Sequence, residues 1–184
     1  MTRSRIILLI ALLFAVSTTA KAQRIALSSN LLEDAIATPN IGAEIVMADR
    51  LSIAFDLSCA PYKLTQQYHN KTLTFRGAYK YWFSQALYAN YLGIDAVFSS
   101  SDVGLGQTNY RQEYIAFGVE YGYSFILNKR MNLVPAVGIG YAYGNTYEGH
   151  DHMISAGNGV EATVITGTRP VVTRLGITLQ YVLK

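Results

Sequence analysis

The sequence predicts an all-β protein: an eight-stranded antiparallel up-and-down transmembrane β-barrel with short periplasmic turns and long extracellular loops. Three observations predict this fold class. Apolar and polar residues alternate along most of the chain, and the connections between the alternating segments are short and long in turn. In addition, 51% of the 184 residues are hydrophobic and only 15% are charged, whereas about a quarter of a typical soluble domain is charged. This combination is typical of outer-membrane barrels.

The alternating segments indicate strands because successive side chains of a strand point to opposite faces. In one of them, Leu51, Ile53 and Phe55 share a face, and the residues between them are smaller or polar. The expected strands run over 25–32, 40–48, 51–60, 72–83, 87–98, 112–127, 131–144 and 171–183. Helical spacing is visible only around residues 31–37.

The connections between these strands differ in length in a regular way. Tight turns are expected at 49–50, 84–86 and 128–130, and longer loops at 33–39, 61–71, 99–111 and 145–170. Short turns at one end and long loops at the other are the plan of an outer-membrane barrel, and an even strand count then places both termini on the short-turn side. Residues 160–168 are themselves extended, so we expect them to lengthen the seventh or eighth strand.

The first residues have the features of a secretory signal. Two arginines precede an apolar run over 6–16, and an Ala-Lys-Ala tripeptide ends at Ala22. The run is shorter than the roughly 20 residues that a membrane-spanning helix needs. We therefore expect cleavage between Ala22 and Gln23, which makes residues 1–22 a signal peptide and residues 23–184 the outer-membrane β-barrel domain.

The charge balance argues against a nucleic-acid-binding protein. The chain has 15 Lys and Arg against 12 Asp and Glu, but three of the basic residues (Arg3, Arg5 and Lys21) lie in the predicted signal peptide. Subtracting them leaves 12 basic and 12 acidic residues. A neutral domain lacks the basic surface that nucleic-acid binding requires.

A soluble eight-stranded barrel is the main alternative fold, and it would place the bulky apolar face inside. Its exterior would need far more charge than 15% supplies. Small residues gather instead on the polar face, which suits the narrow interior of an eight-stranded barrel. They are Gly93, Ala116, Gly118, Gly122, Ala136, Gly138, Gly140 and Ala142. We therefore expect the bulky face to meet lipid.

The aromatic residues of the bulky face fall into two groups by their distance from the short turns. The group near the short turns is Tyr81, Phe83, Tyr88, Tyr121, Tyr123, Phe125 and Tyr181, and the group near the long loops is Phe75, Phe98, Tyr141 and Tyr143. Two such girdles are expected at the two boundaries of a membrane.

Seven charged residues share the face with the small residues, and we expect them inside the barrel. They are Glu44, Asp56, Arg76, Lys80, Asp95, Glu120 and Arg174. Unpaired charges in a narrow interior would cost several kcal/mol each. We therefore predict an interior network of ion pairs that plugs the barrel, with Arg76 beside Asp95.

The last predicted strand has the pattern polar-x-Gly-x-x-hydrophobic-x-aromatic, carried by Arg174, Gly176, Leu179 and Tyr181. This pattern resembles the sorting signal of bacterial outer-membrane barrels. The resemblance implies that the barrel-assembly machinery is a partner during biogenesis. A terminal amphipathic strand suits that role because its edge can pair with another sheet before the barrel closes.

A family resemblance rests on several short motifs in a fixed order. They are Ile25-Ala26-Leu27, Asn30-Leu31-Leu32, Asp34-Ala35, Thr38-Pro39-Asn40, Ile41-Gly42-Ala43-Glu44, Tyr79-Lys80-Tyr81-Trp82-Phe83, Gly118-Val119-Glu120-Tyr121-Gly122-Tyr123 and Gly138-Ile139-Gly140-Tyr141-Ala142-Tyr143. With these motifs the chain resembles a family of small Bacteroides-type outer-membrane β-barrel proteins of unknown function. The resemblance implies a barrel in the bacterial outer membrane and supplies no catalytic residues.

Few residues suggest chemistry. The segment Glu148–His152 could bind a transition metal through its two histidines, although a solvated loop tip explains it better. The same histidines and His69, together with the segment Ser99–Asp102, suggest an alternative, a lipid-modifying enzyme. A hydrolase needs serine, histidine and an acid within hydrogen-bond reach, and we expect no histidine on any strand. We therefore predict no catalytic, cofactor or metal site.

These observations favour a small outer-membrane barrel with a structural or surface-interaction role in adhesion or in the envelope, and not an enzyme. Its expected partners are outer-membrane lipid, the barrel-assembly machinery and an extracellular protein or glycan ligand at the loops. We expect no nucleic acid and no cofactor, and a monomer. A lipid-modifying enzyme and a narrow channel remain the alternatives.

Overall fold

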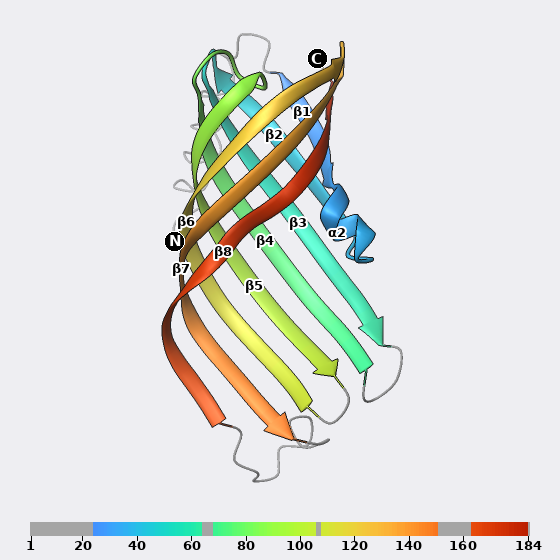
Figure 1. Cartoon of the computed structure of the whole chain (residues 1–184), viewed down its shortest axis with the longest axis vertical. Coiled ribbons are helices and arrows are strands. Elements are labelled where there is room, and N and C mark those ends of the chain that lie inside the picture. Colours follow the sequence, from blue (N-terminus) through green and yellow to red (C-terminus); the bar gives the residue numbers. More distant parts are fainter. Residues whose placement is uncertain (1–23, 64–67, 106–107, 151–162, 184) are drawn as a thin grey trace, which may run out of the picture.

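The computed structural model describes residues 24–63, 68–105, 108–150 and 163–183, which form a closed barrel (Figure 1). Its eight strands follow one another round the wall in chain order, and each pair of neighbours is antiparallel. The predicted fold class is therefore confirmed. The elements are β1 (Ile25–Asn30), α2 (Leu31–Ala35), β2 (Asn40–Ala48), β3 (Leu51–Lys63), β4 (Tyr68–Trp82), β5 (Ala89–Leu105), β6 (Thr108–Asn128), β7 (Met131–His150) and β8 (Thr163–Val182). The predicted signal peptide and its cleavage site, Ala22–Gln23, lie outside the described residues.

The later strands are longer than the sequence predicted. β5 runs for 17 residues, and β6, β7 and β8 for 20 or 21, so they occupy most of the expected long loops. In some of those parts both faces of the strands are polar, as in Ser99–Asp102, and the alternation that marks a strand disappears there. Residues 163–168 of the segment expected to be extended do lengthen a strand, β8, and residues 160–162 lie outside the described residues. The expectation that no histidine lies on a strand was wrong, because His69 belongs to β4 and His150 ends β7.

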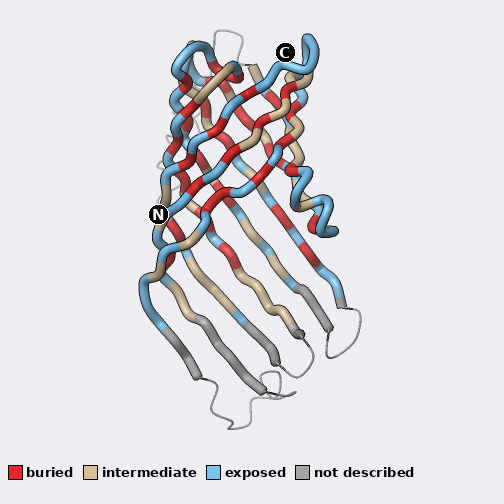
Figure 2. Tube along the Cα trace, viewed as in Figure 1, coloured by how far each residue is buried: buried red, intermediate tan, exposed pale blue. Residues whose placement is uncertain are grey.

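The bulky apolar face of the strands lies outside the barrel and the face with the small and charged side chains lies inside, as predicted. Buried and exposed positions alternate along the described strands (Figure 2). All eleven girdle aromatics are exposed on the outside. The eight small residues face inward and are buried or half-buried.

The short-turn end also holds both ends of the barrel domain, as predicted. The amide of Leu183 donates to the carbonyl of Ile25 over 2.8 Å. The β4–β5 connection at this end is longer than the expected turn at 84–86. It runs over 83–88 and folds into the barrel, where Leu87 is buried with a φ of 69°.

The wall is incomplete on one side. β1 pairs with β8 only up to Asn30, and β2 pairs with β3 only up to Ser58, so the remaining parts of β3 and β8 extend past their neighbours. The short helix α2 lies at this place (Figure 1). No helix in the described part of the chain is long and apolar enough to cross a membrane.

Side chains tie α2 to both flanking strands. Asn30 caps the helix by accepting from the amide of Leu32, and its Nδ2 donates to Glu33 Oε1 over 2.7 Å and to the carbonyl of Leu175 over 3.4 Å. Ser58 on β3 donates to Glu33 Oε2. The helix therefore bridges β8 and β3 where the strands between them have ended.

One bulge interrupts the ladder between β7 and β8. Gly138 pairs with Arg174, and Ile139 pairs with Val172, so Thr173 is an extra residue. As a result Thr173 and Arg174, which are neighbours in sequence, are both buried inside. A bulge of this kind bends its strand, and β8 is visibly curved in Figure 1.

Candidate functional site

The interior of the barrel is the candidate site, because the described charged side chains that are buried gather there. All seven residues predicted for the network lie on inward-facing positions of the strands. Six of them are buried, and Asp56 is half-buried. They are Glu44 on β2, Asp56 on β3, Arg76 and Lys80 on β4, Asp95 on β5, Glu120 on β6 and Arg174 on β8.

One ion pair lies near the short-turn end. Lys80 Nζ is 2.8 Å from Glu44 Oε2. The same carboxylate accepts from Gln180 Nε2 over 3.0 Å, and its other oxygen accepts from Ser52. The Lys80 ammonium also lies 4.7 Å from the centre of the Tyr91 ring. The pair is thus satisfied on several sides, as a buried ion pair must be to be tolerated.

A second group of charges lies one layer further from the short turns. Arg76 Nη1 is 2.7 Å from Glu120 Oε2, and its Nη2 is paired with Asp56. Asp56 also accepts from Arg174 Nη1 over 3.2 Å, and Arg174 Nη2 donates to Thr178 over 2.6 Å. The group connects β3, β4, β6 and β8 across the interior.

The predicted contact between Arg76 and Asp95 was wrong. Arg76 lies opposite Val97, and Asp95 lies opposite Ala78. The reason is the β4–β5 connection, which is longer than the expected turn and shifts the register. Arg76 is therefore paired with Asp56 and Glu120 instead.

Asp95 is the network residue that the ion pairs do not reach. Neither of its carboxylate oxygens has a hydrogen-bond partner among the described residues, and the hydroxyl of the nearby Thr173 has none either. A methyl group on Gly118 would lie 2.7 Å from Asp95 Oδ1 and 2.8 Å from Thr173 Cγ2. Asp95 is thus a tightly packed carboxyl, and the ion pairs join the other six residues.

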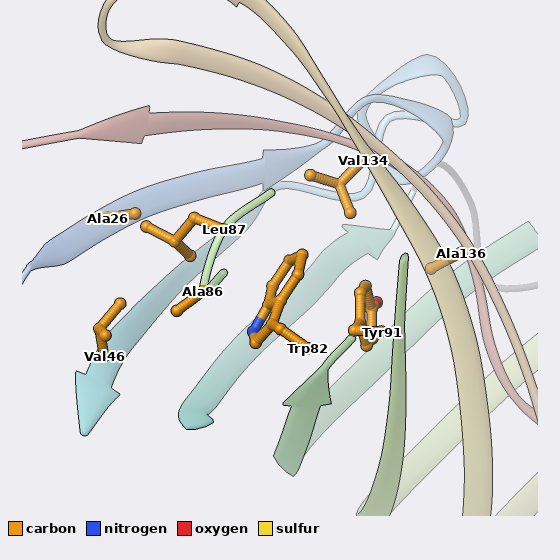
Figure 3. Packing of buried hydrophobic residues seen from close by; sticks show 8 residues of the cluster. All are labelled: Ala26, Val46, Trp82, Ala86, Leu87, Tyr91, Val134 and Ala136. Atoms are coloured by element: carbon orange, nitrogen blue, oxygen red, sulfur yellow. The ribbon is translucent and has the colours of Figure 1, made fainter. Parts of the chain in front are cut away.

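Sequence reasoning missed an apolar cluster that closes the short-turn end. Trp82 on β4 and Tyr91 on β5 lie with their ring centres 4.7 Å apart, and Leu87 from the β4–β5 connection packs into the same cluster (Figure 3). The carbonyl of Leu87 accepts from Ser124 and Asn132 over 2.8 and 3.0 Å. Trp82 is an even number of residues away from Arg76 and Lys80 on the same strand, so its side chain points to the same face. This spacing could have placed Trp82 inside the barrel.

Little space remains between these groups. A gap of about 10 Å³ separates the Glu44–Lys80 pair from the Asp56–Arg76–Arg174 group, and one water molecule needs at least about 10–15 Å³. A larger cavity of about 60 Å³ lies beyond that group, beside Glu33 of α2. Trp82, Tyr91 and the ion pairs therefore fill the half of the interior that lies nearer the short turns.

The residues of the predicted sorting signal all lie on β8. Arg174 and Gly176 face inward, whereas Leu179 and Tyr181 lie on the outer face beside β1. Gly176 has a packing role as well, because a methyl group there would lie 2.8 Å from the side chain of Asn30. Tyr181 accepts from Arg130 Nη1 over 3.3 Å.

The residues considered for chemistry are not brought into one site by the described structure. The side chains of His69 and His150 lie outside the description, as does His152. Ser99 is buried on β5 and lies 3.0 Å from the hydroxyl of Thr74. Among the described residues, no group of three or more His, Cys, Asp or Glu side chains is placed to hold a metal ion.

The comparisons with known proteins give one structural likeness and one family. The chain is similar to Neisserial surface protein A, whose crystal structure matches 86% of this chain and 94% of its own, with 19% sequence identity and a TM-score of 0.46. No curated protein matches the chain. A family model matches residues 8–183, which is nearly the whole chain, and the expected membership of an uncharacterised family is confirmed. The chain belongs to the family described as protein of unknown function (DUF3575).

Proposed function

We propose that this protein is a small barrel of the bacterial outer membrane with a structural or surface-interaction role, in adhesion or in the envelope, and that it is not an enzyme. One observation carries the proposal: the barrel is inverted relative to a soluble protein. Its outer wall is lined by large exposed apolar and aromatic side chains, and its buried charges face inward. Only a lipid environment makes such a wall favourable.

The lengths of the strands support a role at the surface. A strand tilted by about 45° crosses a bilayer in roughly 9–11 residues, and β5 to β8 are 17 to 21 residues long. Their second halves would therefore project beyond the membrane on the side away from the short turns. This projecting sheet is the proposed surface for an extracellular protein or glycan ligand.

The remaining parts of the proposal concern biogenesis and assembly. The predicted signal peptide would direct export, and the pattern on β8 would be read by the barrel-assembly machinery. Outer-membrane lipid is the permanent partner. The closed ring of strands needs no second chain to complete it, which supports a monomer.

The filled interior is the observation that weighs against the channel. The Trp82 cluster and the two groups of ion pairs follow one another along the axis. The enzyme alternative is tested by the activity assay below, because a hydrolase would need serine, histidine and an acid within hydrogen-bond reach.

Gel mobility before and after boiling tests the proposal. A folded barrel resists the detergent and migrates differently once boiling unfolds it, and cell fractionation should recover the protein with the outer membrane. A protein that shows no shift and stays in the soluble fraction would refute the membrane assignment. Lipid hydrolysis or acyl transfer by the purified protein, lost when His150 or His152 is replaced, would instead make the enzyme the better explanation.

A further inference from the structure

The outer wall has one hollow that the proposed function does not explain. It is an open groove of about 730 Å³ on the outside of β6, β7 and β8, a volume in the range of small-molecule sites. Two rows of paired residues form it. One row is Phe117, Tyr141 and Pro170, and the other is Val119, Ile139 and Val172. We call it the outer groove.

The groove is a consequence of a sharp bend in the wall. Gly118 and Gly140 face each other on the inside, and a methyl group on Gly140 would collide with the backbone of β6. The extra residue Thr173 bends β8 at the same level. Where a sheet curls this tightly, the outward side chains diverge. Tyr141, Phe117 and Ile139 are 67%, 63% and 63% exposed.

The chemistry of the groove selects its occupant. No charged residue lines it. The backbone of β6 and β7 is paired on both sides in ladders, and β8 is paired here with β7 alone. A glycan would leave its own polar groups without partners there, which is costly. An extended peptide could pair only along the free edge of β8, on the side away from β7, and not within the groove. A hydrocarbon chain has no polar groups and therefore has no such cost.

The position of the groove points to the same occupant. Tyr141 lies ten residues from Met131, the first residue of β7, which is roughly 23 Å along the axis for a strand tilted by about 45°. The apolar band of such barrels is about 25 Å tall. The groove is therefore part of the apolar wall. It lies in the half of the wall nearer the long loops, beside Tyr141 and Tyr143 of the aromatic girdle at that end.

From these observations, and resting on the proposed membrane location, we propose that the outer groove is a binding site for one acyl chain of a membrane lipid. The site holds this chain in preference to the surrounding detergent or lipid. A second copy of the protein is a poorer fit. The wall is convex here, and two convex corners cannot bury the roughly 800 Å² per partner that a stable interface needs.

A tryptophan reporter tests the site. The chain has a single tryptophan, Trp82, which is fully buried in the interior and gives a constant background. Phe117→Trp places a reporter in the groove. Phe98→Trp is the matched control, because Phe98 is also an exposed outward phenylalanine, lies at a similar height on β5 and does not line the groove. The folded proteins, in micelles of unbrominated detergent, are titrated with phosphatidylcholine that carries brominated acyl chains, which quench tryptophan on contact.

The groove reporter should be half-quenched at a lipid fraction at least about five-fold lower than the control. Adding Val172→Phe to the Phe117→Trp variant should fill the groove and bring its curve back to that of the control. Each variant is first checked for the shift on boiling, and Ile139→Phe replaces Val172→Phe if that variant does not fold.

Three results would overturn the site. If both reporters follow one curve that depends only on the lipid fraction, the groove is ordinary wall, and the membrane location stands. If quenching at Phe117→Trp increases when the protein is diluted, a second copy covers the groove. If neither reporter is quenched even at high lipid fraction, the outer wall does not meet lipid, and the proposed function fails with the site.

Discussion

Arg174 on β8 and Asp56 on β3 lie 3.2 Å apart across the interior, although β1 and β2 separate their strands in the wall. Asp56 also binds Arg76, which in turn binds Glu120. A chain of charges thus spans the barrel close to the level where β1 and β2 end, and it ties β8 to β3 across the interior.

Replacing Arg76 should destabilise the barrel strongly. Arg76→Gln would leave Asp56 with Arg174 alone and leave Glu120 without its countercharge, and breaking a buried ion pair typically costs about 3–5 kcal/mol. Arg111→Gln is the control, because Arg111 lies half-exposed on β6 and forms a surface pair with Glu113, so its loss should change stability by no more than about 0.5 kcal/mol. Urea unfolding in lipid vesicles, followed by Trp82 fluorescence, measures both. Equal losses for the two variants would show that the interior pairs do not stabilise the fold.

The two glycines Gly140 and Gly167 should respond in opposite ways to alanine. A methyl group on Gly140 would collide with the backbone of β6, whereas one on Gly167 would meet nothing within 4 Å. We expect Gly140→Ala to destabilise the barrel by about 1–3 kcal/mol and Gly167→Ala to be neutral or slightly stabilising. The same urea measurement compares them. A neutral Gly140→Ala would mean that β6 and β7 are further apart than the structure has them.

The folded monomer should not conduct ions. The Trp82 cluster and the two groups of ion pairs follow one another along the axis, so removing the aromatic cluster alone, in a Trp82→Ala variant, should not open a path. Planar-bilayer recordings check both proteins. Steady conductance by the wild type would leave the assignment of the faces intact but would show that the interior is hydrated. Trp82→Ala should still lower stability by about 3–5 kcal/mol, as is typical of such a truncation.

Tyr181 should matter for assembly more than an equivalent tyrosine elsewhere on the wall. Tyr181→Ala alters the predicted sorting signal, and Tyr121→Ala removes an equally exposed tyrosine from the same girdle. We expect lower outer-membrane levels for Tyr181→Ala only, measured by fractionation and immunoblotting. Wild-type levels for both variants would make the terminal pattern a coincidence. Gly176→Ala is a less specific test, since the added methyl group would also disturb Asn30 and the cap of α2.

The order of the strands and their two faces could be predicted because lipid on one side and a narrow interior on the other impose a strong contrast on alternate residues. Where that contrast ends, prediction failed. The run Ser99–Asp102 is polar on both faces, so the continuation of β5 was not recognised. The register between β4 and β5 depended on the length of one turn, and the inward fold of Leu87 could not be foreseen from its neighbours.

The interior could be predicted in composition but not in its pairing. The alternation of side chains along each strand was enough to place the seven charged residues inside. Their ion-pair partners depend instead on which strands face each other across the barrel. Contacts such as that of Arg174 with Asp56 join residues far apart in sequence, and local patterns carry no information about them. The same holds for Glu33, whose contact with Ser58 exists only because α2 replaces the ends of two strands.

The seam between the first and last strands has a mechanical consequence. β8 pairs with β1 only over Thr178–Val182, but with β7 from Thr163 to Tyr181. The two ends of the barrel domain sit side by side at that seam. A force that pulls them apart therefore loads the short β1–β8 ladder first and breaks its hydrogen bonds one after another, while the longer β7–β8 ladder bears almost no load.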